Sequence, residues 1–153
     1  MDLNINDIEI INIVKKYEKE AKKVIVDGLK EYFEEYDESL NSDLKNIYET
    51  YNKDNHFFIL GVYNNKVVAT SGLIKENENT GRIVRMSVKK EFRQKGVASL
   101  MIRKIEKIAK NNNCEKLLLE TTKTWEKAIK LYRKNNYKIY KKDERNIYFI
   151  KKI

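Results

Sequence analysis

The chain has 153 residues, with 32 Lys and Arg against 23 Asp and Glu, and a formal net charge of +9. This length predicts one domain spanning residues 1–153. A content of 41% hydrophobic and 36% charged residues is typical of a soluble globular protein, and no apolar run reaches the roughly 20 residues that a membrane span needs. The acidic, polar N-terminus lacks an export pattern, so we expect a cytoplasmic protein without membrane contact.

The chain has few cysteine and histidine side chains, which limits the kinds of site that it can form. Cys114 is the single cysteine and His56 the single histidine, which excludes an intramolecular disulfide and a cysteine-rich metal site. We expect Cys114 to pack in the core and His56 to be structural or exposed. The basic charge alone fits nucleic acid, an acidic cofactor or no particular partner. Without a zinc pattern, an aromatic RNA-binding signature or an uninterrupted basic stripe, we expect no nucleic-acid binding.

The first third of the chain predicts one strand and two helices. An apolar run at residues 8–14 indicates a strand, with the start of a helix as the alternative, and apolar residues at three- and four-residue steps from Ala21 to Phe33 indicate an amphipathic helix. Asn41 or Ser42 is expected to cap a second, short helix that ends near Tyr51.

A hairpin and a strand–helix alternation follow. Two β-rich runs, residues 56–63 and 66–74, flank Asn64-Asn65, and asparagine tolerates the positive φ of a two-residue hairpin. The remaining pattern predicts strands at 82–88, 117–121, 137–140 and 147–150, and helices at 97–109 and 125–134. The resulting order, β, α, α, β, β, β, α, β, α, β, β, fits an α/β domain with a mixed central sheet.

The segment Arg93–Ala98, between a strand and a helix, has the features of an anion site. The first turn of a helix leaves up to four N–H groups unpaired, and the helix dipole adds positive charge there. Gly96 lets a ligand approach the main chain, while Arg93 and Lys95 add side-chain charge. We therefore expect a ligand that carries phosphate.

Arg93-x-x-Gly96-x-Ala98 resembles the signature of the GNAT acetyltransferase superfamily, whose loop holds the pyrophosphate of acetyl-coenzyme A. Leu119-Glu120-Thr121, Ala128-x-x-Leu131-Tyr132 and Asn136-Tyr137 follow in the family's order, although the family usually has Gly-Phe at the last position. The resemblance is good over residues 81–140 and weaker upstream. It implies a GNAT-like fold: a mixed, mostly antiparallel central sheet with a parallel, splayed strand pair and about four flanking helices.

The resemblance also implies that acetyl-CoA is the cofactor. The residues expected to bind it are Met86, Val88, Arg93, Gln94, Lys95, Gly96, Val97, Ala98, Ser99 and Trp125. Main-chain groups near Met86 and Val88 are expected to stay free for the pantetheine arm, and an N–H near Val88 to stabilise the oxyanion. Trp125 stands where the family often has asparagine; it either forms an apolar wall for the arm or packs in the ordinary way.

The implied reaction is acetyl transfer to an amine, which attacks only when neutral. Deprotonating a lysine-like amine at pH 7 costs about 4.6 kcal/mol, so the site needs a base. Glu120 is the first candidate, with a salt bridge to a lysine as the alternative. The acids of residues 31–38 are the second; they attract a cationic acceptor or form a solvated helix end. Tyr132 matches the family tyrosine that protonates the departing thiolate, with core packing as the alternative.

Several functions remain open at this point. We expect an N-acetyltransferase for an amine of a small molecule or peptide, acting as a monomer or homodimer. The alternatives are a protein lysine or N-terminal acetyltransferase, a non-catalytic acetyl-CoA sensor, and a basic nucleic-acid-binding domain. A basic helix face either reaches the nucleotide end of the cofactor or is solvated; it consists of Lys127, Lys130, Arg133 and Lys134.

Overall fold

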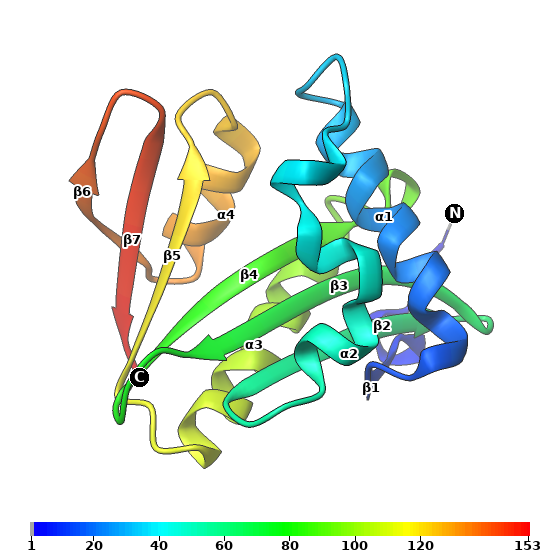
Figure 1. The fold of residues 1–153 in the computed structure, drawn as a ribbon, viewed down its shortest axis with the longest axis horizontal. Coiled ribbons are helices and arrows are strands. Elements are labelled where there is room, and N and C mark those ends of the chain that lie inside the picture. Colours follow the sequence, from blue (N-terminus) through cyan, green and yellow to red (C-terminus); the bar gives the residue numbers. More distant parts are fainter. Residues whose placement is uncertain (1) are drawn as a thin grey trace.

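Seven strands form one sheet in the order β1-β2-β3-β4-β5-β7-β6, and helices cover both of its faces (Figure 1). The computed structural model describes residues 2–153. The strands are β1 (Glu9–Asn12), β2 (His56–Tyr63), β3 (Lys66–Lys75), β4 (Thr80–Val88), β5 (Lys116–Thr122), β6 (Lys138–Lys142) and β7 (Asn146–Lys152). The helices are α1 (Glu18–Lys30), α2 (Ile47–Tyr51), α3 (Val97–Asn111) and α4 (Glu126–Lys134). This order of strands and α-helices confirms the predicted one.

Turn chemistry sets two of the boundaries that the sequence predicted. Asn64 and Asn65 both adopt positive φ, 50° and 62°, in the β2–β3 hairpin. Asn136, with φ of 70°, ends the α4 region in the left-handed conformation, where the resemblance led one to expect glycine. Asparagine therefore replaces glycine at each of these turns.

The cap predicted for the second helix is wrong. The Asn41 side chain makes no cap hydrogen bond; its amide instead donates to the carbonyl of Asp37 at 2.8 Å. Residues 42–46 form a 3₁₀ helix that leads into α2. Neither this 3₁₀ helix nor α2 has a side-chain cap. Asp37 caps a different element, the earlier 3₁₀ turn Glu38–Leu40, by accepting from the backbone N–H of Ser39 at 2.9 Å.

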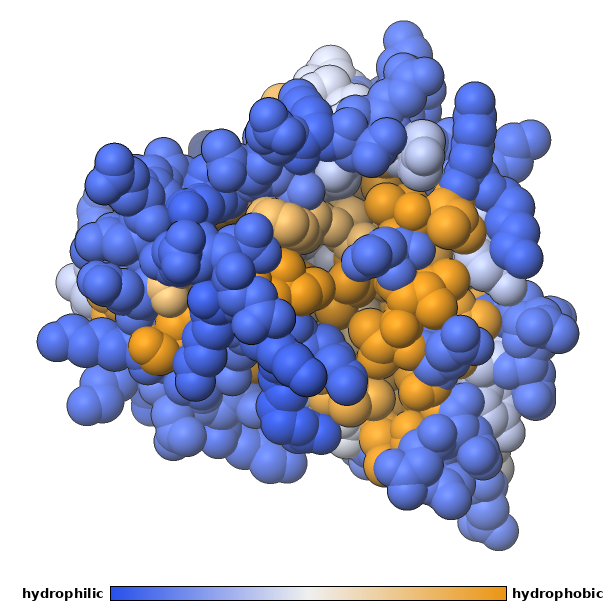
Figure 2. All heavy atoms as spheres, turned by 90° about the horizontal axis from the view of Figure 1, so that it is seen from below, coloured by the Kyte–Doolittle hydropathy of each residue, from blue (hydrophilic) through white to orange (hydrophobic). Residues whose placement is uncertain are grey.

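Two hydrophobic clusters lie on opposite faces of the sheet. One packs α1 and α2 against β2 and β3, and the other packs α3 and α4 against the strands from behind. Seen from below, hydrophilic side chains cover most of the surface and surround a region of hydrophobic atoms (Figure 2).

The parallel pair β4–β5 is the feature that opens the sheet. Only three residue pairs join the two strands, from Thr80↔Lys116 to Arg82↔Leu118, and beyond them the strands diverge (Figure 1). Gly81 permits the close start, since a Cβ there would lie 2.9 Å from side-chain atoms of Leu117 and Leu73. Farther along β4, Arg85 has a φ of 53° where the β3–β4 register shifts. The edge of β4 that faces β5 is therefore unpaired over its second half.

Candidate functional site

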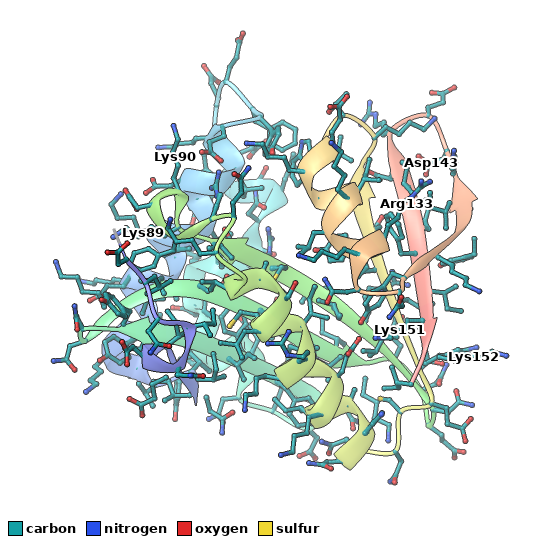
Figure 3. The ribbon with its side chains drawn as sticks, turned by 180° about the vertical axis from the view of Figure 1, so that it is seen from behind. Lys89, Lys90, Arg133, Asp143, Lys151 and Lys152 are labelled. Carbon is teal, nitrogen blue, oxygen red and sulfur yellow. The ribbon has the colours of Figure 1, made fainter. Side chains whose placement is uncertain are left out.

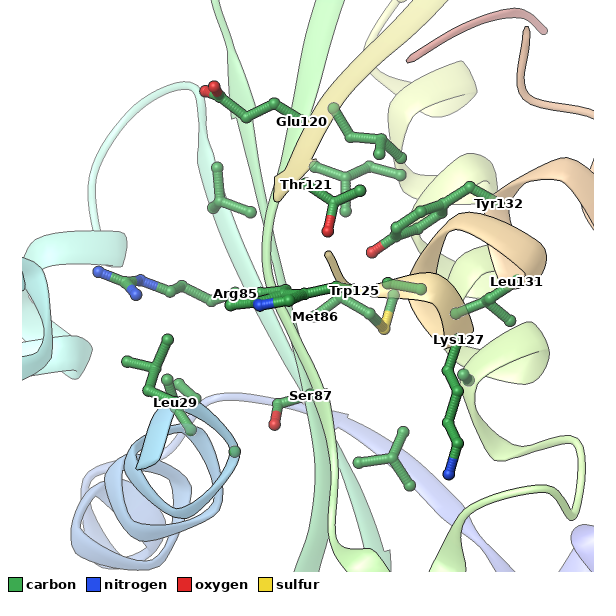
Figure 4. Close-up of a pocket in the computed structure, with 18 of the residues that line it drawn as sticks. Leu29, Arg85, Met86, Ser87, Glu120, Thr121, Trp125, Lys127, Leu131 and Tyr132 are labelled. Atoms are coloured by element: carbon green, nitrogen blue, oxygen red, sulfur yellow. The ribbon is translucent and has the colours of Figure 1, made fainter. Parts of the chain in front are cut away.

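A cavity of about 1000 Å³ lies in the gap between β4 and β5 and is lined from both sides of the sheet. The lining includes Tyr132, Glu120 and every residue that the sequence singled out as cofactor-binding except Lys95. Figure 4 shows how side chains of β4, β5, α1 and α4 surround the space. The topology thus brings residues far apart in the chain to one place, and leaves Lys95 outside it.

The loop before α3 presents its backbone to this cavity. Gln94 and Gly96 have positive φ of 59° and 87°. Within the described residues 2–153, the N–H groups of residues 94–99 have no hydrogen-bond acceptor. A Cβ on Gly96 would have one heavy atom within reach, Ile5 Cδ1 at 4.0 Å, so glycine is favoured here by φ rather than by crowding. Successive free amides beside a 15-residue helix suit an anionic ligand such as a diphosphate.

Arg93 is placed differently from the sequence expectation. Its Nε donates to the carbonyl of Val88 at 2.8 Å, and its Nη1 lies 2.8 Å from Glu31 Oε2. The Val88 carbonyl, expected to be free, is therefore occupied. Because both contacts hold the guanidinium between β4 and the segment after α1, the positive charge is partly neutralised before any phosphate arrives.

Tyr132 lies on α4 and is buried, with 7% of its surface exposed. Its hydroxyl points into the cavity, as does that of Thr121 (Figure 4). Burial raises the pKa of Tyr132 above the ordinary value of 10, so the phenol keeps its proton at neutral pH. The protonated phenol can donate a proton, although the raised pKa makes it a weaker acid than an exposed tyrosine.

Glu120 lies on the opposite face of β5 from Leu119 and Thr121. Those two neighbours are buried against the α3 side, whereas Glu120 is exposed and also lines the cavity. It forms no ion pair within 4 Å among the described residues 2–153, so the predicted alternative of a salt bridge to lysine is not present in the structure. A free carboxylate therefore stands at the α1/α2 side of the opening.

Trp125 precedes α4 and reaches across to the segment that follows α1. Its ring stacks on Tyr32 with centroids 4.4 Å apart and planes inclined by 28°, and Phe33 meets it edge-on at 5.9 Å. Tyr32 and Trp125 both line the cavity. The three rings form an aromatic bridge between α1 and α4, which Trp125 makes in place of the polar contact that asparagine would offer.

A polar cluster on the α1/α2 side was missed by sequence reasoning. Arg85 donates to both carboxylate oxygens of Asp43, at 2.9 and 2.6 Å, and Tyr51 donates to the same carboxylate at 2.8 Å. Burial works to raise the pKa of Asp43, but the hydrogen bonds and charge of Arg85 outweigh it and hold the pKa below its usual value. No local pattern could have found this cluster, because Arg85 lies 42 positions from Asp43 in the chain.

The acidic segment at residues 31–38 is largely used within the protein. Glu31 pairs with Arg93, Glu38 pairs with Lys22 at 3.1 Å, and Asp37 caps a 3₁₀ turn. Of its acids, Glu31 alone lines the cavity. His56 also lines it, and its Nδ1 lies 2.9 Å from the Asp54 carbonyl.

Basic side chains surround the back of the molecule, where α3 and α4 lie. Figure 3 shows Lys89 and Lys90 just after β4, and Arg133 on α4. The α4 residues Lys127, Lys130 and Lys134 line the cavity itself. This distribution favours the approach of an anionic ligand from that side. Over residues 2–153 we find neither a helix long and apolar enough to cross a bilayer nor a cluster of three metal-ligating side chains.

Comparison with known proteins gives a consistent result. The model of the acetyltransferase (GNAT) family matches residues 22–137. No curated protein matches the chain in sequence. A GNAT-family acetyltransferase from Staphylococcus aureus superposes with a TM-score of 0.82 at 25% identity, covering 92% of this chain and 97% of that one.

Two more distant structures share the fold. The PaiA N-acetyltransferase of Thermoplasma acidophilum, crystallised with coenzyme A, has a TM-score of 0.82 at 16% identity, with 95% and 99% of the two chains covered. A GNAT-family acetyltransferase of Elizabethkingia anophelis with acetyl-CoA bound has a TM-score of 0.72 at 16% identity, with 97% and 99% covered.

Proposed function

The chain belongs to the GNAT acetyltransferase family, and from that premise we propose that it transfers an acetyl group from acetyl-CoA to the amine of a small molecule or peptide. It is an acetyl-CoA-dependent acyltransferase, which is what membership of the family establishes. The amine acceptor and the residues that act on it are the proposal. The observation that carries it is the set of free amides at residues 94–99, because Gln94 and residues 96–99 line the same cavity as Tyr132 and Glu120.

The residues of the cavity fit the cofactor. The amides of residues 94–99 and the lysines of α4 would hold its phosphates, and the unpaired edge of β4 would bond the pantetheine amides. Trp125 and Met86 would form the apolar wall of the arm. When bound, acetyl-CoA supplies the acetyl group as a thioester.

Two side chains of this chain are suited to move the protons. Glu120 Oε, unpaired and at the α1/α2 side, would take a proton from the ammonium form of the acceptor, directly or through a water. Tyr132 Oη, kept protonated by burial, would donate the proton that the leaving sulfur needs. The nitrogen thus loses two protons, one from the ammonium before attack and one after the C–N bond has formed, and the sulfur gains one as the C–S bond breaks. The reaction therefore releases one proton to water overall, which carries away the positive charge of the ammonium.

Calorimetry and thiol release test this function. We expect acetyl-CoA and CoA to bind, and free thiol to appear when a primary amine is added. Binding without thiol release across a broad amine panel would instead identify a sensor, and absence of binding would contradict the proposal altogether. Duplex DNA, which should not raise the melting temperature, provides the control for the charge of the chain.

A further inference from the structure

The α1/α2 end of the cavity has the composition of a site for an apolar group. Four aliphatic side chains from α1 and the sheet line it, together with the rings of Tyr32, Tyr51 and Trp125. The aliphatic residues are Ile25, Leu29, Ile74 and Val84.

The charged groups at this end are nearly all paired with one another. Arg85 is bound by Asp43, Arg93 by Glu31, and Arg82 by Glu76 at 3.1 Å. A ligand with many hydroxyls or several charges would have to compete for donors and acceptors that are already occupied. Glu120 is the carboxylate of this lining without an ion-pair partner among residues 2–153, so it offers a place for one cation.

The aromatic bridge adds a flat surface to this end. Tyr32 and Trp125 stack on each other across the opening, yet Tyr32 remains 46% exposed. Exposed aromatic rings that line a cavity bind apolar and aromatic groups well, because such groups bury area against them without leaving polar atoms unpaired.

Resting on acetyl transfer to an amine as proposed above, we infer that the acceptor is a monoamine carried on an aromatic or other apolar body. The body packs against Tyr32 and Trp125, and the amine nitrogen lies toward Glu120. Tyr32 and Trp125 then determine which amine is accepted, and they do so by contact rather than by taking part in proton transfer.

A matched set of amines tests this inference. We expect kcat/KM for 2-phenylethylamine to exceed that for ethylamine and for glucosamine by at least about tenfold, since a buried phenyl group contributes that much in an apolar pocket. In the variant Tyr32→Ala the ratio of kcat/KM for 2-phenylethylamine to that for ethylamine should fall about tenfold, mainly through the KM for 2-phenylethylamine. Tyr17→Ala is the matched control, because Tyr17 flanks the other end of α1 and does not line the cavity.

Binding is read out separately through fluorescence. Trp125 is the only tryptophan of the chain, so intrinsic emission reports the bridge directly. With the protein saturated in CoA, 2-phenylethylamine should change this emission and ethylamine should not. Glu120→Gln should weaken the 2-phenylethylamine response, whereas Glu115→Gln, an exposed acid at the other end of β5, should not.

The outcomes separate the two proposals. If acetyl-CoA binds and thiol is released with glucosamine as fast as with 2-phenylethylamine, or if Tyr32→Ala leaves the preference intact, the inferred acceptor class is wrong while acetyl transfer stands. If no amine causes thiol release, both proposals are wrong.

Discussion

The two ends of the cavity differ in the groups that line them: backbone amides at one end and side chains at the other. At the α3 end the cavity is lined by residues of the loop 94–99, whose backbone N–H groups have no hydrogen-bond acceptor and whose Gln94 and Gly96 have positive φ. At the α1/α2 end it is lined by side chains from distant segments, such as Asp43, Arg85 and Trp125. A backbone site tolerates changes of side chain, whereas a side-chain site changes with each substitution. The first end therefore suits an invariant ligand and the second a variable one.

The largest expected effect is the loss of catalytic rate when Tyr132 is changed. Replacing Tyr132 by phenylalanine removes the proposed proton donor and keeps the packed ring, so kcat should fall about 10²- to 10⁴-fold with acetyl-CoA affinity nearly unchanged. Because burial raises the pKa of Tyr132, its proton is retained to higher pH than usual, and wild-type kcat should show no decline from its loss below about pH 10. Stopped-flow or steady-state thiol release measures both. Unchanged turnover in the variant would remove Tyr132 from the mechanism.

The next largest effect is a loss of acetyl-CoA affinity when Gly96, at the α3 end of the cavity, is changed. Gly96→Asp places a negative charge beside the row of amides, and we expect acetyl-CoA affinity to fall about 100-fold, roughly 2.7 kcal/mol. Gly96→Asn is the matched control, since asparagine has the same shape, tolerates positive φ and carries no charge. Isothermal titration calorimetry compares the two variants. An equal loss of acetyl-CoA affinity in the two variants would mean that backbone strain, and not charge, determines cofactor binding at this loop.

The difference between the two ends also explains what could be read from the sequence. The α3 end is encoded in consecutive residues, so Gly96 and its neighbours could be predicted from the strand–loop–helix pattern and from the resemblance to the family signature, and the strand and helix order followed from periodicity. Even there, the sequence could not tell that Lys95 points elsewhere or that the Val88 carbonyl is bonded by Arg93.

The α1/α2 end could not be predicted in this way. Arg85 meets Asp43 across 42 positions, and Tyr32 meets Trp125 across an even longer stretch of chain. Such pairs depend on how the sheet is assembled, which no local window records. Arg85 also adopts a φ of 53° within a strand, a conformation for which arginine gives no sequence signal.

The side-chain end should depend on its ion pair for stability. Arg85 and Asp43 are 19% and 24% exposed, so Asp43→Asn should lower the free energy of unfolding by about 2 kcal/mol, less than for a fully buried pair. The folded-state pKa of Asp43 is lowered, so its contribution is present above the unfolded value near 3.9 and should disappear as pH falls below it. Urea denaturation at pH 7 and pH 3 measures this. Asp27→Asn, which breaks an exposed pair with Lys23, should cost at most about 0.5 kcal/mol.

The smallest expected effect is that of changing Glu31. This residue lines the cavity and pairs with Arg93 of the loop before α3, so it connects the two ends of the cavity. It holds the Nη1 side of Arg93, and both side chains are about one-third exposed (33% and 32%). Glu31→Gln should therefore cost less than about 1 kcal/mol of stability. The same change releases one side of the guanidinium for phosphate, so acetyl-CoA should bind about two- to fivefold more tightly at low salt, an advantage that added salt should remove.

The control is Glu34→Gln, which changes an exposed acid three residues away and should alter neither the stability nor the affinity for acetyl-CoA. If acetyl-CoA binds Glu31→Gln more weakly than wild type, Glu31 holds Arg93 in its binding position instead of competing with the cofactor for it, and the two ends are cooperative rather than independent.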